Sequence, residues 1–143
     1  MKTYFDHEKL DVYQESILFC SWVGDLRSEI TSKAAAKDQL DRASTSLPLN
    51  IAEGNGKFSA ADRSRFLEIA RGSALECAAC LDVFVARRLI SAEGIVPAKE
   101  QLVRIVKMLM GMLKRFSGRA EFLREDEGTY PSEYDHDHEQ EHE

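Results

Sequence analysis

The chain has 143 residues, of which 43% are hydrophobic and 31% are charged, the balance of a single folded domain with a buried core. No apolar run approaches the roughly 18 residues that span a bilayer, and no secretory signal follows Met1, so the sequence argues against membrane and exported proteins. Three cysteines are an odd number and too few for a disulfide scaffold, and they predict a reducing, cytoplasmic location.

The acidic charge is concentrated at the C-terminus. The formal net charge is -6, yet residues 125–143 contain nine acids and no Lys or Arg. Residues 1–124 therefore carry 19 basic and 16 acidic side chains, a net charge of +3. The terminal segment has neither helical nor strand periodicity. We predict a mildly basic folded domain over residues 1–124 and a disordered acidic tail over residues 125–143.

Helical periodicity begins near the N-terminus. Apolar residues recur at steps of three, four or seven across residues 6–30 and predict a first helix there. Thr31-Ser32 offers an N-cap for a second helix, and Gly54-Asn55-Gly56 is a strong signal for its end. Pro48 lies inside this second helix. Because its ring has no amide hydrogen, the carbonyl of Ser44 loses its helical donor and the helix is expected to bend.

The second half of the chain predicts two further helices. Ser59, followed by an acid in the first turn, is an N-cap signal for a third helix that runs to about Ile90. A fourth helix is expected from Pro97 to at least Phe116, and Gly118 is expected to end or kink it. No β-branched run alternates in polarity, so no strands are predicted. Four long helices with short connections predict an all-α fold, an up-down-up-down four-helix bundle.

The fourth helix has an unusually wide apolar face. Plotted at 100° per residue, its apolar side chains cover an arc of about 180°, whereas a helix facing one core needs little more than about 100°. The outer edge of this band consists of Val103, Val106 and Met110. The excess predicts a second contact surface, most simply with another subunit.

The opposite arc of the fourth helix is basic. This basic stripe consists of Arg104, Lys107, Lys114 and Arg115, and its arc is expected to contain no acid. A solvated surface is one interpretation, because exposed helix faces are usually charged. RNA or DNA binding is the other, because an assembly of several subunits would repeat these cations and phosphate affinity rises steeply with the number of contacts. The stripe has no aromatic residue to stack on bases, so binding is expected to be insensitive to sequence.

Two segments carry a family resemblance. Residues 46–54 read Ser-Leu-Pro-Leu-Asn-Ile-Ala-Glu-Gly, and residues 66–76 read Phe-Leu-Glu-Ile-Ala-Arg-Gly-Ser-Ala-Leu-Glu. Their pattern and separation resemble those of the bacterial four-helix-bundle family first noticed as proteins encoded in intervening sequences of 23S ribosomal RNA genes. The flanking helices extend the resemblance over roughly residues 5–117.

The resemblance implies a bundle that assembles into a ring, typically a homopentamer. It also implies kinship with the accessory variability determinant of diversity-generating retroelements, a basic barrel that binds nucleic acid and a reverse transcriptase. No enzymatic activity is attached to the family, and no cofactor is expected. This chain departs from the retroelement members in its acidic net charge.

The polar residues of the two family segments allow two interpretations. They are Ser46, Pro48, Asn50, Glu53, Gly54, Ser73 and Glu76. One interpretation is a polar network that satisfies the carbonyl released by Pro48 and fixes helix register, because buried polar groups need partners. The other is a ligand or subunit-contact pocket. No nucleophile–base pair accompanies these groups, so no catalytic residue is predicted.

Three other patterns carry weaker signals. Cys77 and Cys80 form a C-x-x-C pattern inside a helix, where small core residues are a better interpretation than a redox or zinc pair. The segment from Gly54 to Ser59 is similar to a phosphate loop, but it follows a helix rather than a strand, and Phe58 separates Lys57 from Ser59. A nucleotide site is therefore not predicted, although Lys57 lies near a helix N-terminus, where it can meet a phosphate. The acids and histidines of residues 135–142 would chelate a metal only weakly, so no metal site is predicted.

These observations leave two functional hypotheses. The first is a non-enzymatic oligomeric scaffold or adaptor that binds RNA or DNA without sequence specificity through the basic stripe. The alternative is a protein-interaction module in which the ring docks another protein and no nucleic acid is bound.

Overall fold

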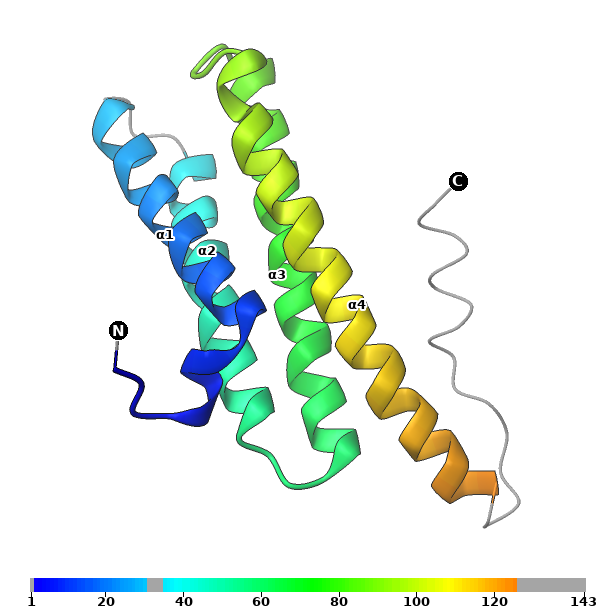
Figure 1. Cartoon of the computed structure of the whole chain (residues 1–143). Helices are drawn as coiled ribbons and strands as arrows, with labels where there is room; N and C mark the ends of the chain where they lie inside the picture. The colour runs from blue at the N-terminus through cyan, green and yellow to red at the C-terminus, as the bar shows by residue number, and fades with distance from the viewer. Residues whose placement is uncertain (1, 31–34, 126–143) are drawn as a thin grey trace.

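The computed structural model describes residues 2–30 and 35–125, with side chains up to residue 116 (Figure 1). Its elements are η1 (Asp6–Lys9), α1 (Asp11–Glu29), α2 (Ala35–Asn55), α3 (Ala60–Ala86), η2 (Glu93–Ile95) and α4 (Val96–Glu125), where η denotes a short 3-10 helix. The predicted all-α fold is confirmed over this part of the chain. The predicted cap at Thr31-Ser32 and the predicted acidic tail beyond Glu125 lie outside the described residues.

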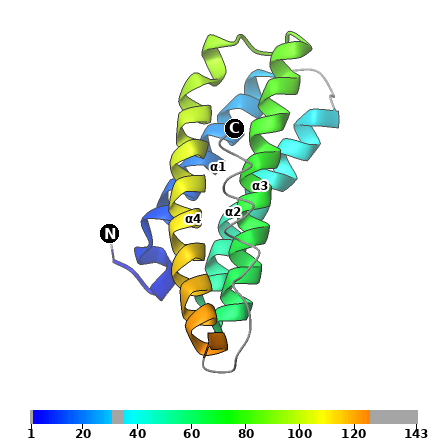
Figure 2. The same ribbon diagram turned by 90° about the vertical axis from the view of Figure 1, so that its right-hand side faces the viewer.

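The four long helices form a bundle in up-down-up-down order (Figure 1). Figure 2 shows α3 and α4 next to each other on one side of the bundle, with α1 and α2 behind them. η1, the α2–α3 loop and the C-terminal turns of α4 all lie at the same end of the bundle. Within the described ranges, no helix has both the length and the apolar character needed to cross a membrane.

Each helix supplies fully buried apolar side chains to one core. Removal of this apolar surface from water stabilises the fold by about 25 cal/mol per Å². The largest of these side chains are Phe19 and Val23 on α1, Leu40, Leu47 and Ile51 on α2, Leu67, Leu81 and Phe84 on α3, and Ile105, Leu109 and Leu113 on α4.

The first helix begins later than predicted. Leu10 has an extended backbone, with φ -73° and ψ 127°, and it separates η1 from α1, so α1 starts at Asp11 rather than Asp6. The carboxylate of Glu8 accepts a hydrogen bond from the amide of Phe5, which makes the N-terminal turn a unit of its own. Apolar spacing continues across this break, and periodicity therefore does not detect it.

The third helix begins as predicted and ends early. The hydroxyl of Ser59 accepts a hydrogen bond from the amide of Asp62 at 3.1 Å, which confirms the predicted N-cap. The helix ends at Ala86 rather than Ile90. Arg88 adopts the left-handed backbone conformation, with φ 61°, and this ends the helical path.

The fourth helix does not end at Gly118. It runs through this residue to Glu125, so the expectation that Gly118 ends the helix was wrong. A single glycine inside a helix costs only about 1 kcal/mol relative to alanine, which is too little to end the helix. No proline lies between Gly118 and Glu125.

α2 and α3 approach each other closely at Gly54. A Cβ atom on Gly54 would lie 3.1 Å from the Cβ of Phe66 and 3.4 Å from the backbone oxygen of Arg63. α2 and α3 also share the most extensive contact of any helix pair. Gly54 therefore sets how closely the two helices pack.

We predict that Gly54→Leu lowers the free energy of unfolding by about 1–3 kcal/mol, because the new side chain must push α2 away from α3. Gly72→Leu is the matched control, since nothing lies within 4 Å of the Cβ position of Gly72 on the same pair of helices. The control variant should be neutral or stabilised by up to about 1 kcal/mol through helix propensity. Urea unfolding at one protein concentration measures both, and equal effects would contradict the spacing role of Gly54.

Candidate functional site

Part of the family motif forms a polar seam between α2 and α3. The amide of Asn50 donates to the hydroxyl oxygen of Ser46 at 2.9 Å and to the carbonyl of Ser46 at 2.8 Å. The hydroxyl of Ser73 on α3 donates to the same Ser46 hydroxyl oxygen at 3.0 Å. Because Ser73 is buried and the other two side chains are half-buried, these bonds fix the register of the two helices.

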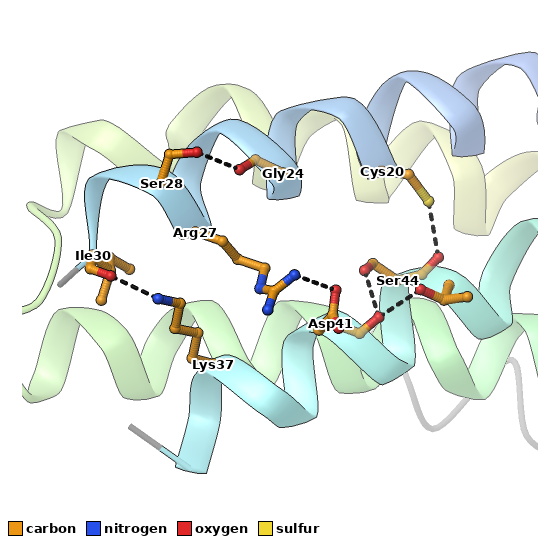
Figure 3. Close-up of polar contacts among 9 residues, drawn as sticks. Cys20, Gly24, Arg27, Ser28, Ile30, Lys37, Asp41 and Ser44 are labelled. Atoms are coloured by element: carbon orange, nitrogen blue, oxygen red, sulfur yellow. Dashed lines mark hydrogen bonds and ion pairs between the residues drawn. The ribbon is translucent and has the colours of Figure 1, made fainter. Parts of the chain in front are cut away.

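The carbonyl released by Pro48 is satisfied from another helix. Pro48 lies inside α2 as predicted, and the Cys20 thiol on α1 donates to the Ser44 carbonyl at 3.1 Å (Figure 3). The expectation that the polar motif network performs this task was therefore wrong. The sequence shows only that Cys20 lies on the apolar face of the first helix. Its hydrogen bond to the Ser44 carbonyl could not be predicted, because the two residues are far apart along the chain.

Figure 3 shows two further links between α1 and α2. Arg27 forms an ion pair with Asp41 at 3.2 Å, and the ammonium group of Lys37 donates to the carbonyl of Ile30 at 2.7 Å. These bonds hold α1 against the half of α2 that precedes Pro48.

The cysteines have the properties of core residues. Cys77 and Cys80 are buried, and burial raises the pKa of both thiols. The pKa of Cys20 is also raised, first by burial and then by the nearby carboxylate of Asp41. Thiols with raised pKa values are poor nucleophiles and poor metal ligands at neutral pH. In the part of the chain that the structure describes, no group of three or more His, Cys, Asp or Glu residues could hold a metal ion.

The two acids of the motif lie on the surface. Glu53 and Glu76 are exposed, and Glu76 accepts a hydrogen bond from the side-chain amide of Gln39 at 3.1 Å. The motif residues therefore line the α2–α3 contact from its buried centre to its exposed edge. They do not converge on an enclosed pocket, so the observed geometry supports the structural interpretation of the motif.

All four residues of the basic stripe are exposed on α4. Arg104 and Lys107 line a cleft of about 510 Å³ between α1 and α4. Arg115 lines an adjoining cleft of about 490 Å³ farther along the same two helices. Asp11 and Met108 border both clefts, so Arg104, Lys107 and Arg115 follow one continuous groove, and Lys114 lies outside its lining.

The expectation that no acid lies in the arc of the basic stripe was wrong, and a second acid reaches the stripe from α1. Glu15 on α1 forms an ion pair with Arg104 at 3.8 Å and also accepts a hydrogen bond from Gln101 at 3.0 Å. Glu100 is exposed one turn before Arg104, on the same arc of the helix. Among the described residues, no ion pair involves Lys107, Lys114 or Arg115. The free positive charge therefore lies in the later part of the stripe.

A separate apolar groove lies between α3 and α4. It has a volume of about 650 Å³, and its walls include Leu75 and Ala78 on α3 and the predicted band edge, Val103, Val106 and Met110, on α4. Val103 is 52% exposed, and the other two residues of the band edge are only half-buried. The single bundle thus leaves the outer part of the band uncovered.

Comparison with known proteins identifies the family. The profile described as 23S rRNA-intervening sequence protein matches residues 8–111. The chain belongs to this family. No curated protein matches the sequence.

The fold of this chain is similar to that of a solved structure, a protein of unknown function from the S23 ribosomal protein family of Bacteroides thetaiotaomicron. The two chains superpose with a TM-score of 0.68 at 24% sequence identity, over 72% of this chain and 98% of the other. At this identity the similarity shows the fold of the bundle and carries no conclusion on activity.

We predict that Cys20→Ala lowers the free energy of unfolding by about 1–3 kcal/mol, because the buried Ser44 carbonyl loses its donor. The penalty should shrink in a Pro48→Ala background, where residue 48 regains the amide that bonds this carbonyl within the helix. A double-mutant cycle by urea unfolding separates this coupling from the packing cost of each substitution. A coupling energy of zero would show that the thiol does not serve the Ser44 carbonyl.

Proposed function

We propose that this chain is a cytoplasmic, non-enzymatic scaffold that assembles into a closed homo-oligomer and binds RNA or DNA without sequence specificity through the basic stripe of α4. The observation that carries the nucleic-acid part is the exposure of four cations on α4, three of which line the α1–α4 clefts. In the described part of the chain, Lys107, Lys114 and Arg115 form no ion pair. Lys and Arg at such positions neutralise phosphates and release counterions, which favours binding irrespective of base sequence.

The local charge on α4 supports this proposal despite the acidic whole chain. Residues 96–116 contain five basic side chains and a single acid, Glu100. The formal net charge of the chain is -6 because the acids gather elsewhere, above all beyond Glu125. Polyanions respond to the potential within about a Debye length of a surface, roughly 10 Å at 0.1 M salt, so the local charge decides binding.

The apolar groove between α3 and α4 supports the oligomeric part. Its band edge, Val103, Val106 and Met110, is an apolar surface that the single bundle leaves partly uncovered. A second copy of the chain would cover it, and the family resemblance suggests five copies in a ring. Each copy would bring its own basic stripe, so that the assembly presents more phosphate contacts than one subunit can.

The non-enzymatic part is supported by how the polar motif residues are used. Within α2, Asn50 donates to the hydroxyl oxygen and the carbonyl of Ser46, and Ser73 on α3 donates to the same hydroxyl oxygen across the seam. The buried thiols have raised pKa values, so they are not activated nucleophiles. The docking of another protein on the assembled ring is the competing function, and the binding experiments below distinguish the two.

We predict that the full chain sediments as a closed oligomer at micromolar concentration and that Val103→Asp with Met110→Asp converts it to a monomer. Burial of two carboxylates in an apolar contact is strongly unfavourable unless they are paired. Leu49→Asp is the matched control, because Leu49 is 58% exposed on α2 and does not line the groove. Sedimentation equilibrium checks all three proteins. A monomeric wild-type chain would refute the assembly, and dissociation of the control would refute the assignment to this groove.

We predict that removal of residues 126–143 strengthens binding to RNA or DNA. The deletion removes eight acids and changes the formal net charge from -6 to +2. The gain should be largest at about 50 mM salt, because the competition between acids and phosphates is electrostatic. Arg104→Glu with Lys114→Glu in the truncated chain should abolish the gain. Fluorescence anisotropy of a labelled oligonucleotide measures each affinity.

The control for charge alone is Arg42→Glu with Arg87→Glu, which makes the same change at exposed cations outside the stripe. This control should lose much less affinity than the stripe variant. If the truncated chain binds no better than the full chain at low salt, the stripe is only a solvated face, and the protein-docking function takes the place of the proposal.

A further inference from the structure

The α2–α3 loop lies at one end of the bundle (Figure 1). Aromatic and cationic side chains gather around this loop. This loop-end cluster consists of Lys57, Phe58, Arg63, Arg65 and Phe66. It lies outside the clefts and the groove described above. We infer that the loop-end cluster is a binding site for single-stranded nucleic acid, in which an unpaired base stacks on Phe58 while Lys57 and Arg65 contact the adjacent phosphates.

The exposure of Phe58 is the first observation. Its side chain is fully exposed, more so than any other large apolar residue in the described part of the chain. Phe58 immediately precedes the N-cap Ser59, where an apolar residue usually packs against the fourth residue of the helix as a staple. That fourth residue is Arg63, and the full exposure of Phe58 shows that no staple forms. Phe58 therefore has no packing role within the bundle and is free to present its ring.

The second observation is that the neighbouring cations are held in place by aromatic rings. The ammonium nitrogen of Lys57 lies 4.9 Å from the ring centroid of Phe66, and the guanidinium carbon of Arg65 lies 5.0 Å from the same centroid. Cation–π contacts of this kind orient a charge without neutralising it. Residues 57–66 contain one acid, Asp62, whose carboxylate oxygen lies 3.9 Å from a guanidinium nitrogen of Arg65 in an exposed ion pair. The cluster keeps a net positive charge beside an exposed ring.

The third observation is that the cluster adjoins the basic stripe. Arg63 donates through its Nε to the Lys57 carbonyl at 2.5 Å, which ties the loop to α3. The guanidinium carbon of Arg63 also lies 5.5 Å from the ring centroid of Phe116 on α4. Phe116 directly follows Lys114 and Arg115, the end of the stripe. The end of the stripe therefore lies on the turn of α4 that contacts Arg63 of the loop-end cluster.

Single-stranded nucleic acid is the ligand that fits both the exposed ring of Phe58 and the cations beside it. Cations beside an exposed aromatic ring match the phosphates and the unpaired bases of one strand, and stacking is tolerant of base identity. A duplex offers phosphates but keeps its bases stacked internally, so Phe58 would gain little from it. The inference rests on the proposed function in one respect, namely that the chain binds nucleic acid, and it adds a preference for single strands.

The test compares a labelled oligonucleotide of about 16 nucleotides with its own duplex, using the full chain at about 50 mM salt and fluorescence anisotropy. We expect the single strand to bind more tightly. Phe58→Ala should weaken single-strand binding about tenfold and leave duplex binding unchanged. Phe58→Trp should retain the affinity, whereas Phe58→Leu, which keeps only apolar character, should behave like alanine. Leu49→Ala is the control for loss of an exposed apolar side chain elsewhere.

A second readout detects the stacking itself. Trp22 is the only tryptophan, so Phe58→Trp in a Trp22→Phe background places a single indole in the loop. Its fluorescence should be quenched by the single strand and not by the duplex.

The outcomes separate this inference from the proposed function. If Lys107→Glu with Lys114→Glu leaves binding intact while Phe58→Ala weakens it, binding through the basic stripe is refuted and binding at the loop-end cluster is supported. If single strand and duplex bind alike and Phe58→Ala has no effect, the cluster is refuted and the stripe stands. Retention of full affinity by Phe58→Leu would also overturn the inference, because it would show that stacking on an aromatic ring does not contribute to oligonucleotide binding. If neither oligonucleotide binds, both proposals fail.

Discussion

The close packing of α2 on α3 is the constraint on which the rest of the structure depends. Gly54 permits it, because a Cβ atom there would lie 3.1 Å from the Cβ of Phe66. The Ser46–Asn50–Ser73 seam then fixes the register of the two helices. These residues belong to the two segments by which the family resemblance was found. The motif is thus explained by helix packing, and it needs no catalytic role.

This packing also determines what the chain presents on its surface. It places Phe66 and Arg63 beside the α2–α3 loop, where the cations of the loop-end cluster gather around aromatic rings. On the other side of α3, the groove shared with α4 keeps an exposed apolar edge. Lys107 borders both this groove and the cleft that carries the basic stripe. Assembly through the groove would therefore bring the stripe close to the neighbouring subunit, so self-association and polyanion binding are expected to be coupled.

The sequence predicts features whose causes are local. The Ser59 cap depends on residues within one turn, and the helical class of the fold depends on apolar spacing, and both are confirmed. The sequence does not predict partners that meet only after packing. The Cys20 thiol serves a carbonyl on a different helix, and Glu15 reaches Arg104 across the α1–α4 cleft. Likewise, the full exposure of Phe58 depends on how the α2–α3 loop lies against the bundle, which composition and periodicity do not encode.

The central claim is that nucleic acid contacts the bundle along α4 and at the α2–α3 loop. Photo-crosslinking of the full chain to a single-stranded oligonucleotide with photoreactive bases, followed by peptide mapping, tests it most directly. We expect cross-links in the loop peptide that contains Phe58 and in the α4 peptides that flank Lys107 and Arg115, all suppressed by about 0.2 M salt. Cross-links confined to other surfaces, or none above a non-binding control protein, would contradict the claim.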